Sequence, residues 1–385
     1  MSVTAAAGFR AAGVTAGLKP SGKPDVALVV NDGPRRDAAA VFTSNRCKAN
    51  PVLWSERTIA DGQLSAVVLN SGGANCYNGP EGFQTTHASA ELVAELVGGA
   101  AFDVAVCSTG LIGQPLDRGL LEAGIKAAAE QLSATGGAVA AEAIMTTDTV
   151  AKEAVATGDG WVVGGMAKGA GMLAPALATM LVVITTDAVA DAADLDAALR
   201  AATAVSFDRL DTDGCMSTND TVILMASGTS GVTAGRDELT AAVTTVCDDL
   251  ARQLWTDAEG SHHDIEIVVR GAADEADALA VGRAVARSNL FKAAVFGGDP
   301  NWGRVLAAVG TTSATFEPDA IDIAMNGVEV CRGGGTRHGE PATAVDLSGR
   351  HVLVEIDLGA GRHEATIRTS DLTHDYVHEN SAYST

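Results

Sequence analysis

The segment LAPALATML, residues Leu173–Leu181, lies in the middle of the chain between two contrasting stretches. A glycine-rich run, GDGWVVGGMAKGAG (Gly158–Gly171), precedes it, and an apolar run typical of a strand, TMLVVITT (Thr179–Thr186), follows it. The glycine-rich run is the strongest change of composition in the sequence, and it predicts a loop that separates two halves. Two interpretations of the junction are open: Thr179 begins a strand after an ordinary loop, or the chain is cut before it.

A cut between Ala178 and Thr179 would give the threonine a chemical role. A threonine hydroxyl is a weak nucleophile at neutral pH and needs a nearby base. The freed α-amine, with an ordinary pKa near ~8, is such a base and lies on the same residue. The same hydroxyl can make the cut by attacking the preceding carbonyl, and the small residues before it suit the strained loop that this attack requires.

Short β-branched runs bounded by turn residues alternate with segments whose apolar residues recur at helical spacing. The pattern predicts an α/β protein with multi-stranded mixed sheets and packed helices. Strands are predicted over residues 25–30, 38–44, 64–70, 103–109, 179–186, 221–228, 264–272, 320–327, 351–359 and 364–371. Helices are predicted over residues 85–98, 116–133, 194–205, 237–255 and 276–288.

Composition narrows the function class. The 385 residues include 26 basic and 48 acidic side chains, a net charge of −22, which disfavours nucleic acid and anionic membrane surfaces as partners. No apolar run approaches the ~20 residues of a membrane span, and the first residues lack the pattern of a secretory signal. We therefore expect a cytoplasmic protein whose six scattered cysteines are reduced.

Several motifs fail the chemistry that they suggest, so the sequence predicts neither a cofactor nor a metal. GGMAKGAG has Ala before and Gly after Lys168, whereas a phosphate loop needs Gly and Ser/Thr there. In DTDG (Asp211–Gly214) the glycine comes too early for a calcium loop. His374 and His378 could share a helix face and hold zinc, but solvated histidines are the better interpretation. CSTGLIG (Cys107–Gly113) is a turn that could face an oxyanion if the nucleophile lay elsewhere.

The segment GMAKGAGMLAPALATML (Gly165–Leu181) closely resembles the autocleavage segment of the ornithine acetyltransferases, the glutamate N-acetyltransferases of arginine biosynthesis. Further motifs follow in the order of that family, so the resemblance covers essentially the whole chain. They are AVFTSNRCKANPV (Ala40–Val52), VVLNSGGANCYNG (Val67–Gly79), CSTGLIG, AIMTTDT (Ala143–Thr149), DTDGCMSTNDTV (Asp211–Val222), DAEG (Asp257–Gly260), GGDPNWGR (Gly297–Arg304) and HENSAYST (His378–Thr385).

The resemblance implies a chain cleaved between Ala178 and Thr179, giving an α chain (1–178) and a β chain (179–385), with an N-terminal-nucleophile-like active site formed after autocleavage. Thr179 is then the nucleophile, and Thr109 and Gly110 form the oxyanion hole. The implied substrate contacts are Thr146, Lys168, Thr179, Glu259, Asn380 and Thr385, and the hydroxyl of Thr147 is the alternative to that of Thr146.

These residue types suit an amino-acid substrate. Lys168 can pair with a carboxylate, and Glu259, with the free carboxylate of Thr385, can receive an ammonium group. Without the resemblance, a solvated lysine, a surface glutamate and a frayed C-terminus are the better interpretations. One departure from the family pattern follows Gly260, where the chain reads SHHD (Ser261–Asp264), and it affects the expected shape of the substrate pocket.

The implied activity is transfer of acetyl from N2-acetyl-ornithine to glutamate, by a ping-pong mechanism through acetyl-Thr179 and without a cofactor. Acetyl-CoA is left open as a second donor, and an (αβ)2 or higher assembly is expected by analogy. Two alternatives remain. A self-processing aminopeptidase would share the cut but pass its acyl group to water, and a non-catalytic amino-acid-binding protein would not cleave itself.

Overall fold

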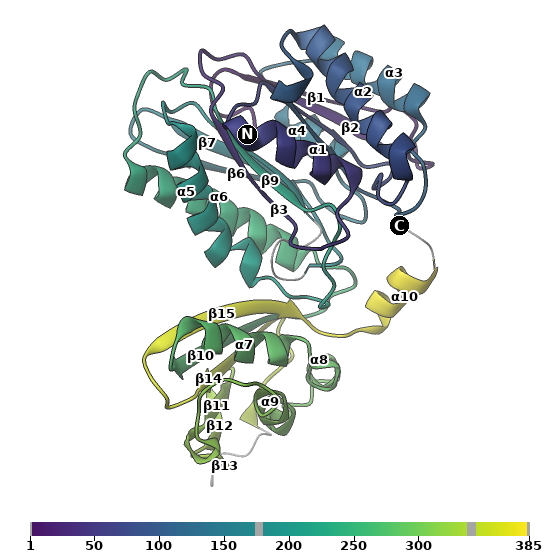
Figure 1. Ribbon diagram of the computed structural model, residues 1–385. Helices are drawn as coiled ribbons and strands as arrows, with labels where there is room; N and C mark the ends of the chain where they lie inside the picture. Colours follow the sequence, from purple (N-terminus) through teal and green to yellow (C-terminus); the bar gives the residue numbers. More distant parts are fainter. Residues whose placement is uncertain (1, 174–179, 337–343, 383–385) are drawn as a thin grey trace.

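The computed structural model describes residues 2–173, 180–336 and 344–382, which form three β-sheets with helices packed on them. Each sheet mixes antiparallel pairs with a parallel pair: β4–β5 in the first, β8–β9 in the second and β10–β14 in the third. The expected fold class, α/β with multi-stranded mixed sheets and packed helices, is confirmed. The first two sheets lie face to face in one body, and the third forms a second body below it (Figure 1).

The first sheet has the order β1-β2-β4-β5. Its strands are β1 (Phe9–Val14), β2 (Val26–Asn31), β4 (Ala66–Asn70) and β5 (Val104–Ser108). Its outer face packs against α1, α2 and α3. The helices of this region are α1 (Asn50–Thr58), α2 (Gly79–Val97), α3 (Arg118–Glu130) and α4 (Gly137–Ala143), with short 3-10 turns η1 (Ile59–Asp61) and η2 (Ala101–Asp103). The inner face, with α4, packs against the second sheet.

The second sheet has the order β3-β9-β8-β7-β6 and carries α5 and α6 on its far face. Its elements are β3 (Ala38–Phe42), β6 (Lys152–Thr157), β7 (Val162–Lys168), β8 (Leu181–Thr186), β9 (Thr221–Ala226), α5 (Ala192–Val205), η3 (Phe207–Arg209) and α6 (Arg236–Thr256). All six residues of β8 are buried, because successive side chains of a strand point to opposite faces and both faces are covered. Leu181 faces the first sheet, and Val182 faces the helices.

The expectation of a loop over Gly158–Gly171 is wrong for most of that run. Val162–Lys168 is strand β7, which pairs with β6 on one side and β8 on the other. The glycines serve close packing on both faces of the sheet. A Cβ at Gly164 would lie 2.3 Å from the carbonyl oxygen of Ser2, and one at Gly165 would lie 2.9 Å from the Val246 side chain. High glycine content therefore marks a crowded strand here, not a linker.

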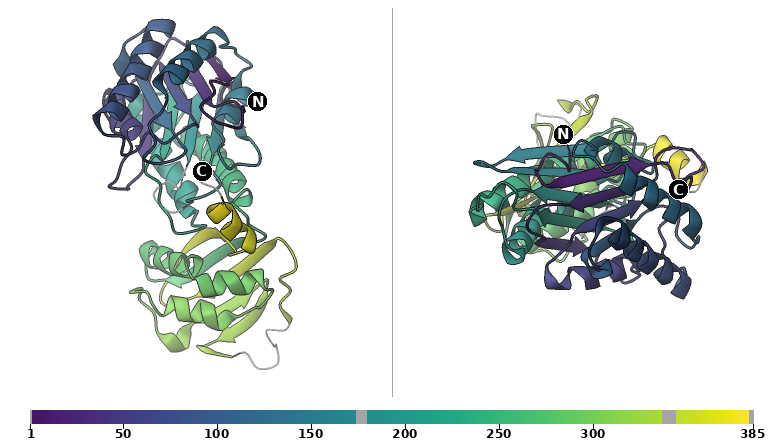
Figure 2. Two further views of the ribbon diagram at one scale, coloured as in Figure 1. Left: turned by 90° about the vertical axis from the view of Figure 1, so that its right-hand side faces the viewer. Right: turned by 90° about the horizontal axis from the view of Figure 1, so that it is seen from above.

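The second body is a sheet of order β13-β12-β11-β14-β10-β15, with α7 packed on one face. Its elements are β10 (Asp264–Ala272), α7 (Glu275–Ala286), α8 (Asn289–Phe296), α9 (Trp302–Val309), η4 (Pro318–Ala320), β11 (Asp322–Met325), β12 (Val328–Arg332), β13 (Gly335–Thr336), β14 (His351–Asp357) and β15 (His363–Ser370). After β15 the chain returns toward the first body as α10 (His374–Ala382), seen as the isolated yellow helix in Figures 1 and 2.

The topology brings several strand ends to one place. Lys168, the last residue of β7, is registered with Leu181, the first residue of β8, and Leu181 is registered with Thr221, the first of β9. The end of β5 lies at the same edge, since Lys168 Nζ is 3.4 Å from Thr109 Oγ1. None of the helices in the described part of the chain combines the length and the apolar character that a bilayer-spanning helix needs.

Candidate active site

The turn after β5 presents an unpaired backbone donor. The chain reverses at Gly110, whose φ of +127° is a conformation that few residues other than glycine adopt. A Cβ there would lie 2.8 Å from the nitrogen of Gly73, so the position also has no room for a side chain. The N–H of Gly73 donates to the carbonyl of Thr109 at 3.0 Å and holds the turn. No described residue accepts a hydrogen bond from the N–H of Gly110, which leaves this donor for an oxygen that develops charge.

Lys168 places a cation next to this turn. Its side chain is 1 % exposed, and its ammonium lies 3.4 Å from Thr109 Oγ1. Burial lowers the pKa of Lys168, while the carboxylates of Asp148 and Glu259 act in the opposite direction. Among the described residues, Lys168 has no ion-pair partner. A buried ammonium group in this state favours an incoming carboxylate as its partner.

A buried ion cluster fixes the approach to Lys168. Lys152 is fully buried, and its Nζ lies 2.7 Å from Asp148 Oδ1 and 2.6 Å from Asp257 Oδ2. Asp148 also accepts hydrogen bonds from the N–H groups of Thr146 (2.9 Å) and Gly169 (2.6 Å). Burial alone would raise the pKa of Asp148, but the neighbouring lysine ammonium groups hold it below its usual value. Asp148 therefore stays anionic and ties the turn at Thr146 to the end of β7.

Glu259 forms the opposite end of the site. Its Oε1 accepts a hydrogen bond from Thr147 Oγ1 at 2.7 Å, and its Oε2 accepts one from Asn380 Nδ2 at 3.0 Å. Its N–H donates to the carbonyl of Ala170 at 3.0 Å. A Cβ at Gly171 would lie 2.5 Å from the Glu259 carboxyl carbon, so this carboxylate packs directly on the chain that follows Lys168. Three segments that are distant in sequence thus meet at one carboxylate, whose remaining lone pairs can accept from an ammonium group.

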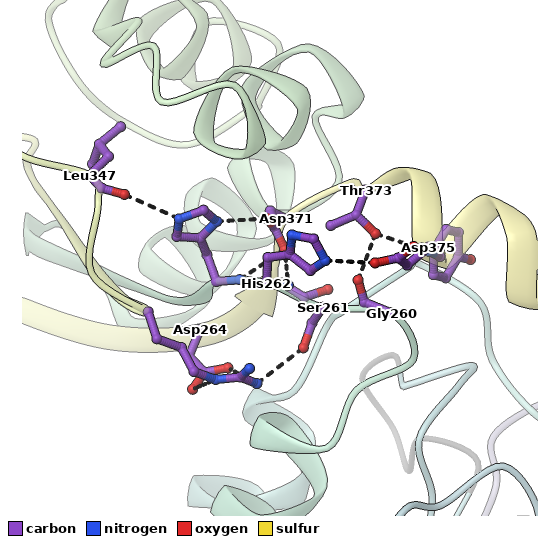
Figure 3. A network of polar contacts seen from close by, with 12 residues as sticks. Gly260, Ser261, His262, Asp264, Leu347, Asp371, Thr373 and Asp375 are labelled. Carbon is purple, nitrogen blue, oxygen red and sulfur yellow. Dashed lines mark hydrogen bonds and ion pairs between the residues drawn. The ribbon is translucent and has the colours of Figure 1, made fainter.

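The SHHD departure anchors the segment that leads into α10. Figure 3 shows the N–H of His262 directed at Asp371, and both this N–H and that of His263 donate to Asp371 Oδ1 at 3.0 Å. His263 Nδ1 lies 2.7 Å from Asp371 Oδ2, and its Nε2 lies 3.1 Å from the carbonyl oxygen of Leu347. The unusual residues therefore hold the returning chain through main-chain and side-chain contacts. They act on the site through the position of α10.

Gly260 lets α10 approach closely. Its φ is +58°, and a Cβ there would lie 2.2 Å from the nitrogen of Tyr376. Thr373 Oγ1 donates to the carbonyl of Gly260 at 2.6 Å (Figure 3). We call the segment Gly260–His263 the α10 seat. It places Asn380, the third residue from the end of the described helix, against Glu259.

A buried acid lies at the start of β8. Asp220 is fully buried, and its Oδ1 accepts a hydrogen bond from the N–H of Met180 at 3.3 Å. Burial raises the pKa of Asp220 well above its usual value. Within the described residues its Oδ2 has no hydrogen-bond partner. The carboxyl group is thus bonded to the residue that directly follows Thr179 in the sequence.

The structure brings together most of the residues expected from the sequence. Thr109, Gly110 and Lys168 meet at one end of the site, and Thr147, Glu259 and Asn380 meet at the other. Thr146 lies on the same turn as Thr147 and contributes its N–H to Asp148, whereas the hydroxyl that contacts Glu259 belongs to Thr147. The cleavage pair Ala178–Thr179 and the C-terminal Thr385 lie outside the described residues.

Sequence reasoning missed three buried ionisable residues that organise the site. Asp220 stands in the DTDGCMSTNDTV motif, but nothing in that motif distinguishes it from the other polar residues. Lys152 belongs to none of the motifs, and a lysine in sequence is expected to be exposed. Asp257 stands beside Glu259 in DAEG without a separate signal. Each of the three has a partner in a distant segment, Lys152 and Asp257 through one another and Asp220 through Met180, so only the fold reveals them.

Comparison with known proteins gives matches along the whole chain. The sequence model of the ArgJ family matches residues 10–385. The "Arginine biosynthesis bifunctional protein ArgJ" of Streptomyces coelicolor is 63% identical over 384 residues, with 100% of both chains covered. The protein of the same name from Thermobifida fusca is 60% identical over 385 residues, again with 100% of both chains covered. A crystal structure of ornithine acetyltransferase complexed with ornithine, from Mycobacterium tuberculosis, is 53% identical and covers 47% of this chain and 96% of its own, with a TM-score of 0.45.

Proposed function

The chain belongs to the ArgJ family, and from this premise we propose that it is a glutamate N-acetyltransferase of arginine biosynthesis. The donor is N2-acetyl-ornithine, the acceptor is glutamate, and the acetyl group is carried as an ester on Thr179. The products are ornithine and N-acetyl-glutamate. The relatives are named bifunctional, and on this ground we include acetyl-CoA as a second donor.

The reaction proceeds in two transfers. Thr179 Oγ attacks the acetamide carbonyl while the α-amine of Thr179 accepts the hydroxyl proton. The N–H of Gly110, with the hydroxyl of Thr109, stabilises the oxyanion of the tetrahedral intermediate. Ornithine leaves with the proton, and the amine of glutamate then attacks the acetyl ester. Collapse of the second intermediate releases N-acetyl-glutamate and restores the threonine.

The observation that carries the proposal is the separation of opposite charges along one short segment. Lys168, buried and without a described ion-pair partner, begins this segment, and Glu259 packs on Gly171 at its other end. N2-acetyl-ornithine carries two free charged groups, an α-carboxylate and a side-chain ammonium. We assign the carboxylate to Lys168 and the ammonium to Glu259, which Thr147 and Asn380 hold in place. Thr385 is proposed as a further contact of the substrate.

The proposal includes the covalent state of the protein. Residues 1–178 form the α chain and residues 179–385 the β chain after the cut before Thr179, and we expect an (αβ)2 or higher assembly in the cytoplasm. Asp220 accepts a hydrogen bond from Met180 and so fixes the start of β8 beside Lys168. The turn Thr109–Gly110, which we call the oxyanion turn, lies next to the same lysine. The α-amine that acts as base exists only after the cut, so turnover requires cleavage. Both steps use the hydroxyl of Thr179.

Replacing Thr179 by alanine tests this function. The intact mass of the denatured wild-type protein should show two chains, the second beginning Thr179-Met180-Leu181 on N-terminal sequencing. The Thr179→Ala protein should stay a single chain and transfer no acetyl group. An uncleaved Thr179→Ala chain that retains transferase activity would refute the mechanism.

The acceptor distinguishes this function from the two alternatives. Wild-type protein incubated with N2-acetyl-ornithine and glutamate should release ornithine and form N-acetyl-glutamate in equal amounts. Release of ornithine with free acetate, unchanged by glutamate, would instead indicate a self-processing hydrolase of the aminopeptidase kind. An intact chain that binds ornithine without turnover would indicate an amino-acid-binding protein.

A further inference from the structure

Asn219 connects the two sheets at the oxyanion turn. It lies two residues before β9, in the second sheet, and its side chain is buried. Its Nδ2 donates to the carbonyl of Ala74 at 2.7 Å and to the carbonyl of Ser108 at 2.8 Å. Ser108 is the last residue of β5, and Ala74 lies in the segment that follows β4, so both carbonyls belong to the first sheet and its connections. One amide group thus spans from one sheet to the other.

The orientation of this amide follows from its partners. Carbonyl oxygens only accept hydrogen bonds, so the NH2 group of Asn219 must face Ala74 and Ser108. The opposite atom, Oδ1, accepts a hydrogen bond from Thr218 Oγ1 at 2.6 Å. Both N–H donors and the carbonyl of the side chain are therefore in use. A buried amide with every group engaged this way defines a single position for the segments that it joins.

The two bonded carbonyls flank the residues of the oxyanion turn. Ser108 directly precedes Thr109 and Gly110, and Ala74 directly follows Gly73, whose N–H donates to Thr109. The main-chain hydrogen bond of Thr109 remains within the first sheet, since its N–H donates to the carbonyl of Asn70 at 2.9 Å. From the second sheet, Lys168 Nζ also lies 3.4 Å from the Thr109 hydroxyl. The bonds from Asn219 come from the second sheet, which also carries Lys168 and the start of β8.

We propose that Asn219 is a positioning residue for the transferase reaction, and this inference rests on the proposed function. It sets the distance between the oxyanion donor at Gly110 and the chain that begins at β8. An oxyanion hole acts only when its donors lie at hydrogen-bond distance from the developing charge. A displacement of about 1 Å at such a site lowers the rate by roughly 10²-fold. Asn219 makes no contact with the substrate in this assignment, so its loss changes kcat and not KM.

Asn31 provides a matched control. It is 1 % exposed, and its Nδ2 donates to two main-chain carbonyls, Arg35 at 3.0 Å and Ala226 at 3.1 Å. It therefore links the end of β2 to the end of β9, as Asn219 links the segment before β9 to the first sheet. Removing either amide takes a donor from two main-chain carbonyls, although the Arg35 carbonyl keeps the hydrogen bond from Arg36 Nη1 at 3.1 Å. Only Asn219 touches the oxyanion turn.

The experiment compares Asn219→Ala and Asn219→Asp with Asn31→Ala and Asn31→Asp in the purified full-length protein. For the Asn219 variants we expect kcat to fall by about 10²-fold with KM within about 3-fold of wild type. The Asn31 variants should keep wild-type kcat. Equal kcat values for Asn219→Ala and Asn31→Ala, or a change confined to KM, would overturn the inference. If the aspartate variant does not fold, the alanine variant still decides the question, because water can occupy the space that the removed amide leaves.

Amide hydrogen exchange separates this inference from the proposed function. Peptides covering residues 108–111 should exchange faster in Asn219→Ala than in Asn31→Ala, because only the first variant releases the turn. Unchanged exchange there would contradict the positioning role whatever the activity. A wild-type protein that lacks acetyl transfer would refute the proposed function, while the exchange result would still report on the link made by Asn219.

Discussion

Substituting alanine for Gly260 perturbs the contact between the α10 seat and the main chain of α10. Two penalties arise together. A left-handed backbone at a residue with a Cβ costs about 1–2 kcal/mol, and Gly260 has a φ of +58°. The new Cβ would lie 2.2 Å from the nitrogen of Tyr376, so α10 has to move by roughly 1 Å to restore ordinary contact distances.

The described contacts of α10 are few, so its release is the least costly response. No side chain of α10 is buried. Beyond the contacts that Asp371 makes, three polar contacts hold the helix and Thr373, the residue just before it: Thr373 Oγ1 to Gly260, Asn380 Nδ2 to Glu259, and His262 Nε2 to Asp375 at 2.8 Å. At about 1 kcal/mol each, they supply roughly 3 kcal/mol, which the clash removes. The opened fraction should then rise by about 100-fold, since 1.4 kcal/mol is a factor of ten.

Gly298→Ala is the control for this experiment. Gly298 has a φ of +69°, and a Cβ there would meet no atom within 4 Å, so the substitution carries the backbone penalty without a clash. Limited digestion with chymotrypsin, followed by mass spectrometry, reports cleavage after Tyr376. We expect cleavage at least about 10-fold faster in Gly260→Ala than in Gly298→Ala, with thermal midpoints within about 2 °C of each other.

Activity should follow the position of α10. Release of the helix removes Asn380 from Glu259, and the hydrogen bond of about 1 kcal/mol between them corresponds to a factor of about five, so kcat/KM should fall by about 5-fold. Equal rates of cleavage after Tyr376 in the two variants would refute the reasoning. So would a wild-type kcat/KM in a protein whose α10 is shown to be released.

Two further predictions concern buried charges. Lys152→Met leaves Asp148 and Asp257 buried without their cation, and urea unfolding should show a loss of about 3–5 kcal/mol in the free energy of unfolding; an unchanged value would contradict the buried triad. Burial raises the pKa of Asp211 to about 6 in spite of Arg287, whose Nε lies 2.7 Å away, so the folded state binds the proton more tightly than the unfolded chain. The stability that this proton provides is present below the unfolded pKa near ~3.9 and is lost as the pH rises through about 6, so Asp211→Asn should gain on wild type by about 2 kcal/mol between pH 4 and pH 7; a constant difference across that range would count against the burial argument.

The sequence predicts those parts of the fold where periodicity is strong and local. The helix expected over residues 237–255 is α6, and the strand expected over residues 264–272 is β10. β7 was not expected, because a strand buried on both faces is usually recognised by branched side chains. In β7, Gly164 and Gly165 replace them where neighbouring chains approach. The space that neighbouring segments leave determines which residues such a strand can hold, and a single sequence window does not contain that information.

The site was predictable only where a motif carried it. Resemblance to a family pointed to Lys168, Glu259 and Asn380, which the fold brings to one region from β7, the turn after α6, and α10. It gave no role to Asn219 or Lys152, because the carbonyls that Asn219 binds and the Asp257 carboxylate that Lys152 binds lie far away in the chain. Hydrogen bonds to main-chain atoms leave no mark on the sequence of the acceptor, so positioning residues of this kind become visible only in three dimensions.

The pairing of β7 with β8 makes refolding of the protein depend on whether the proposed cut has occurred. The two strands share six residue pairs, from Val163 with Thr186 to Lys168 with Leu181, and the proposed cut falls between them. Before the cut, this antiparallel pair closes a short loop within one chain, so the sheet assembles in a first-order process. After it, the same pairs join two polypeptides, and reassembly from the denatured state becomes a second-order reaction that slows on dilution. The proposed cut thus changes a chain that refolds at a rate independent of concentration into a pair of chains that refold together only when their concentration is high enough.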